Sequence, residues 1–231
     1  MNEEQTPESH KLGSDHEQMD PFQKKVFEGM AFARRHKKPL VIAGCALLAV
    51  ILIFSGVLYS IRNAERNASG LLARTLNTYH KMSSEGSDGY EAVTEDFRKL
   101  LEEYPNTKAG KIGKFRFAGI CYDATKYDRA YELYNRALSD FKNDPVMESL
   151  IHNALGRTCI ALEKYEEAER YFKKVSDVEK SVMKDEALFS LGMIAEKSGR
   201  NTDDEFYRDL LENHPQSIYQ PLAQSKAESF E

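Results

Sequence analysis

The longest apolar stretch in the chain runs from Leu40 to Ile61 and contains no charged residue. As a helix rising about 1.5 Å per residue, it would cover the roughly 30 Å hydrocarbon core of a bilayer. A buried helix of a soluble domain is the alternative, but such a helix rarely stays uncharged on every side over this length. We therefore expect a transmembrane helix over residues 39–61.

The charges on either side of this stretch predict its orientation. The segment before it carries a cluster of bases, Arg34, Arg35, Lys37 and Lys38. After it, Arg62 and Arg66 are accompanied by Glu65. Because positively charged flanks stay on the cytoplasmic side of a membrane, we expect residues 1–38 in the cytoplasm and the larger C-terminal part across the membrane.

A possible processing site lies inside the apolar stretch. Ile42-Ala43-Gly44-Cys45 fits a lipoprotein cleavage box, which would make Cys45 a lipidated N-terminus. A secretory signal, however, places its apolar run before the cleavage site. Most of the apolar residues here follow Cys45, so we expect an uncleaved signal anchor, with processing at Cys45 as the alternative.

The segments before the apolar stretch differ in character. Residues 1–20 are acidic and lack apolar periodicity, so we expect a disordered tail there. In residues 21–38, Phe22, Val26 and Met30 recur every four residues among lysines and arginines. This pattern suits either an amphipathic helix on the anionic inner leaflet or a simple basic flank that fixes topology.

Beyond residue 61 the apolar positions follow a helical spacing throughout. We expect a stalk helix and linker over residues 62–86 and a helical repeat domain over residues 87–231. Tetratricopeptide repeats pair two antiparallel helices in about 34 residues, with small side chains where the helices cross. Two copies of that pattern are Phe117-Ala118, Tyr127, Ala130, Tyr134, Ala137 and, 38 residues later, Leu155-Gly156, Tyr165, Ala168, Phe172, Val175.

Two weaker copies flank these repeats. Leu191-Gly192 opens one, and Phe97 with Leu100 matches the second helix of a partial first repeat. A last helix after Pro215 would close the stack. Degenerate end repeats are typical of a solenoid, whereas a generic helical bundle would need no repeat. The predicted fold is all-α: one N-terminal transmembrane helix followed by a tetratricopeptide-like α-solenoid.

The sequence contains no motif for catalysis. It has no glycine-rich phosphate loop, nucleophile elbow or zinc-protease motif, and its six histidines are scattered without metal-ligand spacing. We therefore expect no enzyme activity, no cofactor and no metal. The net charge of −5 gives no reason to expect nucleic acid as a partner. Cys121 and Cys159 occupy equivalent positions in adjacent repeats, too far apart for a disulfide, and we expect two buried free thiols.

The remaining candidate site is a docking groove for proteins or peptides. In a solenoid, the first helices of successive repeats line such a groove. The repeat register predicts six groove-facing residues: Phe115, Tyr122, Asn153, Arg157, Phe189 and Met193. Aromatic side chains beside an arginine and an amide suit a bound polypeptide. Burial within the stack is the alternative for some of them.

The order of segments, with the stretch from Phe97 to Leu138, resembles the bacterial ancillary subunit of the Sec translocon. Asn106-Thr107 and Ala109 carry the local likeness. The resemblance implies a single-span inner-membrane scaffold whose periplasmic repeats help chaperones to meet emerging chains. The chain departs from that family in its acidic tail, its lack of tryptophan and its segment after Pro215.

Two other functions remain open from the sequence. The chain could be an adaptor of another envelope machine, such as cell division or outer-membrane assembly. It could also be an organelle import receptor with cytosolic repeats, which would require the opposite orientation.

Overall fold

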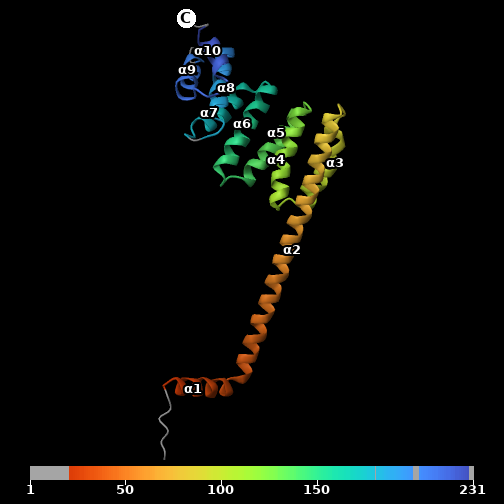
Figure 1. Cartoon of the computed structure of the whole chain (residues 1–231), viewed down its shortest axis with the longest axis vertical. Coiled ribbons are helices and arrows are strands. Elements are labelled where there is room, and N and C mark those ends of the chain that lie inside the picture. Colours follow the sequence, from red (N-terminus) through yellow and green to blue (C-terminus); the bar gives the residue numbers. More distant parts are fainter. Residues whose placement is uncertain (1–20, 180, 200–202, 229–231) are drawn as a thin grey trace, which may run out of the picture. The chain divides into compact units, whose positions relative to one another are not determined.

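The computed structural model describes residues 21–179, 181–199 and 203–228, and every regular element in them is a helix. The acidic tail predicted for residues 1–20 lies outside the described residues. The chain forms two compact units, Met1–Tyr59 and Ser60–Glu231. Figure 1 follows the helices in order, with α1 and α2 in orange, α3 to α5 in yellow and green, and α6 to α10 in teal and blue. Their bounds are α1 Pro21–Arg35, α2 Lys37–Ser84, α3 Gly89–Glu103, α4 Lys108–Asp123, α5 Tyr127–Asp140, α6 Pro145–Ala161, α7 Tyr165–Ser176, α8 Lys184–Lys197, α9 Asp203–Asn213 and α10 Gln220–Ala227.

The first unit consists of α1 and the beginning of α2. Along the apolar stretch of α2, the large side chains are exposed, as at Leu52 (72%) and Ile53 (67%). Within the described residues, α2 is the one helix that is long and apolar enough to cross a membrane, judged by length and composition. An exposed apolar surface of this length is unfavourable in water and is typical of a site that contacts lipid or another protein.

The second unit begins within α2, at Ser60. Ala68, Leu72 and Thr75 of α2 are buried in the core that α3 and α4 share. Thr75 also donates a hydrogen bond to the Asp96 carboxylate of α3, with 3.3 Å between the oxygens. The segment 62–86, which we expected to be a stalk outside the repeat domain, is therefore mostly the first helix of that domain.

The following helices form antiparallel pairs, α4 with α5, α6 with α7 and α8 with α9, and each pair packs on the next. Glycines allow the two helices of a pair to approach closely. A Cβ added at Gly156 would lie 2.7 Å from the ring of Phe172, and one added at Gly192 would lie 2.5 Å from the ring of Tyr207. The crossing at Gly156 follows the predicted register, whereas Tyr207, the ring that covers Gly192, was not predicted. Both crossings belong to the all-α solenoid that the sequence predicted.

The turns inside the pairs repeat as well. Thr125 and Glu163, 38 residues apart, both adopt a left-handed backbone conformation with φ near +60°. The next residue in each turn is a lysine, whose backbone N–H donates a hydrogen bond to a cysteine carbonyl near the end of the preceding helix. These bonds join Lys126 to Cys121 and Lys164 to Cys159, both with 2.8 Å between nitrogen and oxygen. In this way the turn satisfies carbonyls that the helix end leaves without a partner.

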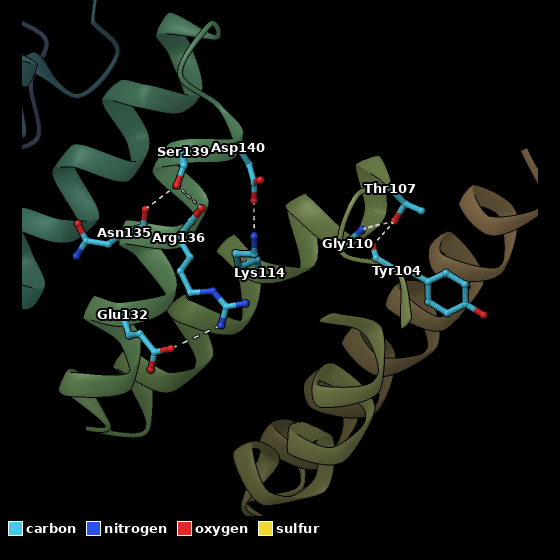
Figure 2. A network of polar contacts seen from close by, with 9 residues as sticks. All are labelled: Tyr104, Thr107, Gly110, Lys114, Glu132, Asn135, Arg136, Ser139 and Asp140. Carbon is cyan, nitrogen blue, oxygen red and sulfur yellow. Dashed lines mark hydrogen bonds and ion pairs between the residues drawn. The ribbon is translucent and has the colours of Figure 1, made fainter. Parts of the chain in front are cut away.

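The start of α4 is held by residues from two other segments. The Thr107 hydroxyl accepts a hydrogen bond from the Gly110 N–H at 2.9 Å, as Figure 2 shows. The Glu65 carboxylate of α2 accepts hydrogen bonds from the N–H groups of Lys108 (2.7 Å) and Ala109 (3.0 Å). Three donors at the positive end of the helix dipole are thereby satisfied, two of them by an anion.

A buried ion pair joins this helix to the next. Figure 2 shows the Lys114 ammonium of α4 meeting the carboxylate of Asp140 at the end of α5. Both side chains are largely shielded from water, with 9% and 21% exposed. Because a buried charge without its partner is costly, the pair favours the register of α4 against α5.

The last helix closes the solenoid. α10 packs on α9, and Ala223 of α10 lies with Tyr207 and Leu210 of α9 in the final core cluster. The predicted closing helix after Pro215 is therefore present.

Candidate docking groove

Four of the six predicted groove residues line one hollow. Tyr122 of α4, Arg157 of α6, and Phe189 and Met193 of α8 come together at a cavity of about 190 Å³. The lining also includes Ile160 of α6, Glu186 and Ser190 of α8, and Tyr219, which lies just before α10. Side chains from three successive repeats thus converge at one place.

Arg157 is the charged centre of this hollow. Its guanidinium carbon lies 5.2 Å from the ring centroid of Tyr122, a cation–π distance. Its Nε lies 3.8 Å from a carboxylate oxygen of Glu186, and the Arg157 side chain remains 51% exposed. An ion pair of this length in water contributes little, so the guanidinium remains available to a carboxylate or carbonyl of a bound chain.

Aromatic rings form the apolar side of the hollow. The ring of Phe189 stacks on Tyr219 with 5.1 Å between centroids, and it tilts against Tyr207 at 5.8 Å. Phe189 itself is nearly buried, at 9% exposed, whereas Met193 is 38% exposed. Burial, followed by the nearby carboxylate of Glu186, raises the pKa of Tyr219, so its hydroxyl stays protonated and can donate a hydrogen bond.

The structure does not bring the other two predicted residues to this hollow. Phe115 is half-buried against Tyr134, with 5.7 Å between ring centroids. Asn153 is 4% exposed, and its amide nitrogen lies 3.8 Å from the sulfur of Met183. Within the described residues, the Asn153 side-chain oxygen has no hydrogen-bond partner. A role for either residue in binding stays a prediction.

A second hollow continues the first toward the C-terminal helix. It has a volume of about 440 Å³ and shares Ile160 and Met193 with the first. Its rim carries Lys197, whose ammonium lies 4.2 Å from the ring centroid of Tyr165, and Glu196, which pairs with Lys226 at 2.7 Å. Together the hollows give an apolar floor with charged edges, as binding surfaces for polypeptides have.

Within the described residues, no cluster of histidine, cysteine and carboxylate side chains could hold a metal ion. Cys121 and Cys159 are buried and unbonded, which confirms the two free thiols. Burial raises the pKa of both thiols to about 11, and the thiol form is a poor nucleophile.

Four residues of the first hollow were not predicted from the sequence: Ile160, Glu186, Ser190 and Tyr219. Glu186 lies three residues before Phe189 on the same helix, so helical spacing alone could have added it. Tyr219 belongs to the closing segment, which the repeat pattern does not cover.

A tetratricopeptide-repeat family model matches residues 151–182, which cover most of α6 and all of α7. No curated protein matches the chain in sequence. Two similar solved structures are titled as the protein MamA: "MamA 41-end from Desulfovibrio magneticus RS-1" (16% identity, 63% of this chain, 77% of that one, TM-score 0.51) and "Crystal structure of MamA protein" (14%, 69%, 85%, 0.51).

A third similar structure is the apo form of RapI. It has 18% identity and a TM-score of 0.53, and the match covers 83% of this chain and 53% of the RapI chain. At these identities the likeness concerns the fold alone. The matched repeat, the three helix pairs and these structures together establish that residues 60–231 form a tetratricopeptide-like α-solenoid, a fold that serves protein–protein interaction.

Proposed function

We propose that the chain is a membrane-anchored scaffold of the bacterial envelope that docks protein partners in its repeat groove during protein export. The partners are the Sec translocon and periplasmic chaperones. The observation that carries the docking role is the convergence of Tyr122, Arg157 and Met193 from three repeats at one partly exposed hollow. In this proposal the groove binds protein partners and catalyses no reaction.

The proposed anchor is the apolar stretch of α2. Its exposed side chains and its length support insertion, and the bases before it support a cytoplasmic N-terminus with periplasmic repeats. Anchoring would raise the effective concentration of a weak groove near a membrane-bound partner without adding any contact. The Sec association rests on the sequence resemblance around Asn106-Thr107 and Ala109.

The test is photo-crosslinking from the groove in living cells. A photoreactive residue replaces Met193, which is exposed and lines both hollows. We expect covalent products with translocon subunits and chaperones. Adding Arg157→Glu should reduce the yield by about tenfold or more, since loss of a groove anchor can cost about 2 kcal/mol of binding. The matched control is Arg170→Glu on α7, an exposed arginine outside both hollows.

The outcomes separate the competing functions. Products only with division or outer-membrane assembly proteins would contradict the export role and leave the docking role intact. An undiminished yield from the Arg157→Glu protein, with Arg170→Glu behaving alike, would mean that the hollow is not the docking site.

A further inference from the structure

Most of the large apolar side chains of α1 gather on one face of the helix and are exposed, whereas Phe32, also exposed, lies on the other side. Phe22, Val26 and Met30 are spaced by four residues and therefore share a face, with Phe27 at its edge. They are 73%, 43%, 46% and 59% exposed. Four large apolar side chains on a helix of this length form a surface that water disfavours.

The other side of α1 is basic. At 100° per residue, Lys24 and Arg35 lie opposite the apolar face, and Lys25 and Arg34 lie at its two flanks. Across residues 21–38, which include Lys37 and Lys38, six bases stand against Glu28 as the single acid. A helix with an apolar face, a basic face and this excess of positive charge is complementary to an anionic lipid surface.

We propose that α1 lies in the plane of the bilayer, with its apolar face at the acyl boundary and its bases on anionic lipid headgroups. The inference rests on the proposed anchoring by α2 and adds a second, lipid-selective contact to it. Basic side chains near an anionic surface are attracted over about a Debye length, which makes the contact sensitive to salt.

The covalent connection places α1 where such a contact is possible. One residue, His36, separates α1 from α2. The His36 N–H donates to the Phe32 carbonyl and the Leu40 N–H donates to the His36 carbonyl, both at 3.0 Å. Since a chain spans at most about 3.6 Å per residue, the end of α1 at Arg35 lies within roughly 18 Å of Leu40, where the apolar stretch begins.

The experiment uses the absence of tryptophan from the chain. Two full-length variants each carry one probe, Phe22→Trp on the apolar face or Phe32→Trp on the opposite side. Each is placed as a single copy in lipid nanodiscs made either of phosphatidylcholine or of its equal mixture with phosphatidylglycerol. Fluorescence is quenched from the water by acrylamide and from the bilayer by brominated lipid chains.

With anionic discs, we expect blue-shifted Phe22→Trp emission that brominated lipid quenches severalfold more than acrylamide does. The Phe32→Trp probe should show the reverse. Adding Lys24→Glu and Lys25→Glu should return the Phe22→Trp signal to its value in phosphatidylcholine discs. The same charge change at exposed Lys99 and Lys142 of the repeats should leave it unchanged.

Three results would overturn the proposal. Equal acrylamide quenching of both probes would place α1 in water, and equal quenching by lipid would mean that it inserts with the span. Identical Phe22→Trp signals in the two kinds of disc would remove the role of anionic lipid. A chain that does not co-purify with discs at all would instead refute the anchoring by α2, so the two failures are distinguishable.

Discussion

At the scale of single residues, the solenoid depends on small side chains beneath large rings. Gly156 and Gly192 occupy equivalent positions in α6 and α8, and each lies under an aromatic ring of the paired helix. Because the ring and the facing backbone are both held in a packed core, an added methyl group has little room to be accommodated.

Replacing Gly156 by alanine should therefore destabilise the repeat unit. The added Cβ meets Phe172 at 2.7 Å, and overpacking of this kind costs about 1–3 kcal/mol despite the higher helix propensity of alanine. The measurement is the melting temperature of a fragment comprising residues 60–231. Gly70→Ala on α2, where no atom lies within 4 Å of the new Cβ, is the matched control and should be neutral or slightly stabilising. Equal melting temperatures of the Gly156→Ala and native fragments would contradict a tight crossing at Gly156.

His152 should make the repeat unit less stable as the pH falls. Burial, followed by the charge of Lys174, lowers the pKa of His152, whose ring lies 5.9 Å from that of Tyr171. The folded chain therefore binds this proton less tightly than the unfolded chain. The stability contributed by the neutral ring is complete above the unfolded pKa of about 6.5 and is lost as the pH falls through that value toward the lower folded pKa.

Urea unfolding of the fragment at pH 7.5 and pH 5 tests this expectation. The free energy of unfolding should fall more for the native fragment than for His152→Phe, which cannot be protonated there. His80→Phe, at an exposed position, should keep the native pH dependence. Equal decreases in the free energy of unfolding of the native and His152→Phe fragments between pH 7.5 and pH 5 would contradict a contribution from His152 and assign the pH dependence to carboxylates.

At the scale of elements, the joint between α2 and α4 extends the repeat unit beyond what the periodicity indicated. Glu65 of α2 accepts hydrogen bonds from the first two N–H groups of α4, 43 and 44 residues away in sequence. The last part of α2 is thereby tied to the second repeat by polar contacts as well as by Leu72.

Removing the charge at Glu65 should loosen the start of α4. We expect Glu65→Gln to cost about 0.5–2 kcal/mol, the range for helix caps and charge–dipole contacts. Hydrogen exchange at the amides of Lys108 and Ala109 should accelerate. Glu103→Gln, the same change at an exposed site, is the control. A fragment beginning at Asn67 lacks Glu65 and should be less stable than one beginning at Ser60. Unchanged exchange at these amides would refute the cap.

The repeat pattern predicted the helix pairs well because it records contacts within about forty residues. The spacing and the side-chain sizes of Leu155-Gly156 and Phe172 predict that their two helices cross closely there. Glu65 carries no such signal, since a glutamate on an exposed helix and a helix cap look alike in sequence. Thr125 and Glu163 adopt a left-handed conformation where glycine would be expected, so the turns also escaped prediction.

The groove was predictable in part for the same reason. The register identified Tyr122, Arg157, Phe189 and Met193, which share a hollow. It could not show that Asn153 turns toward Met183 instead, because the rotamer of one side chain depends on neighbours from the next repeat. Tyr219 comes from outside the repeat pattern altogether.

At the scale of the whole molecule, the chain combines an exposed apolar helix with a folded repeat unit. The exposed stretch of α2 follows a basic segment, and the repeat unit carries ordinary mixed charge on its surface. The proposed anchoring assigns the first unit to a bilayer and the second to water.

The orientation across the membrane is testable with a fused reporter. Alkaline phosphatase, which is active only outside the bacterial cytoplasm, should be active when fused after Glu231 and inactive when fused to the N-terminus. The basic residues before Leu40 are the physical reason. Replacing Arg34, Arg35, Lys37 and Lys38 by glutamine should produce a mixed orientation. Activity from the N-terminal fusion alone would reverse the topology and favour the import receptor.

The order in which the helices pack has a consequence for biogenesis. Each helix pair packs mainly on the pair that precedes or follows it in the chain, with α4 reaching no further than α6 among the major helix contacts. Structures rich in local contacts fold quickly and can begin folding at any repeat. If the repeats cross the membrane starting from α2, each pair can fold on arrival against the pair already outside, without waiting for α10. Translocation and folding could then proceed in step, and each newly folded pair would hinder the chain from sliding back.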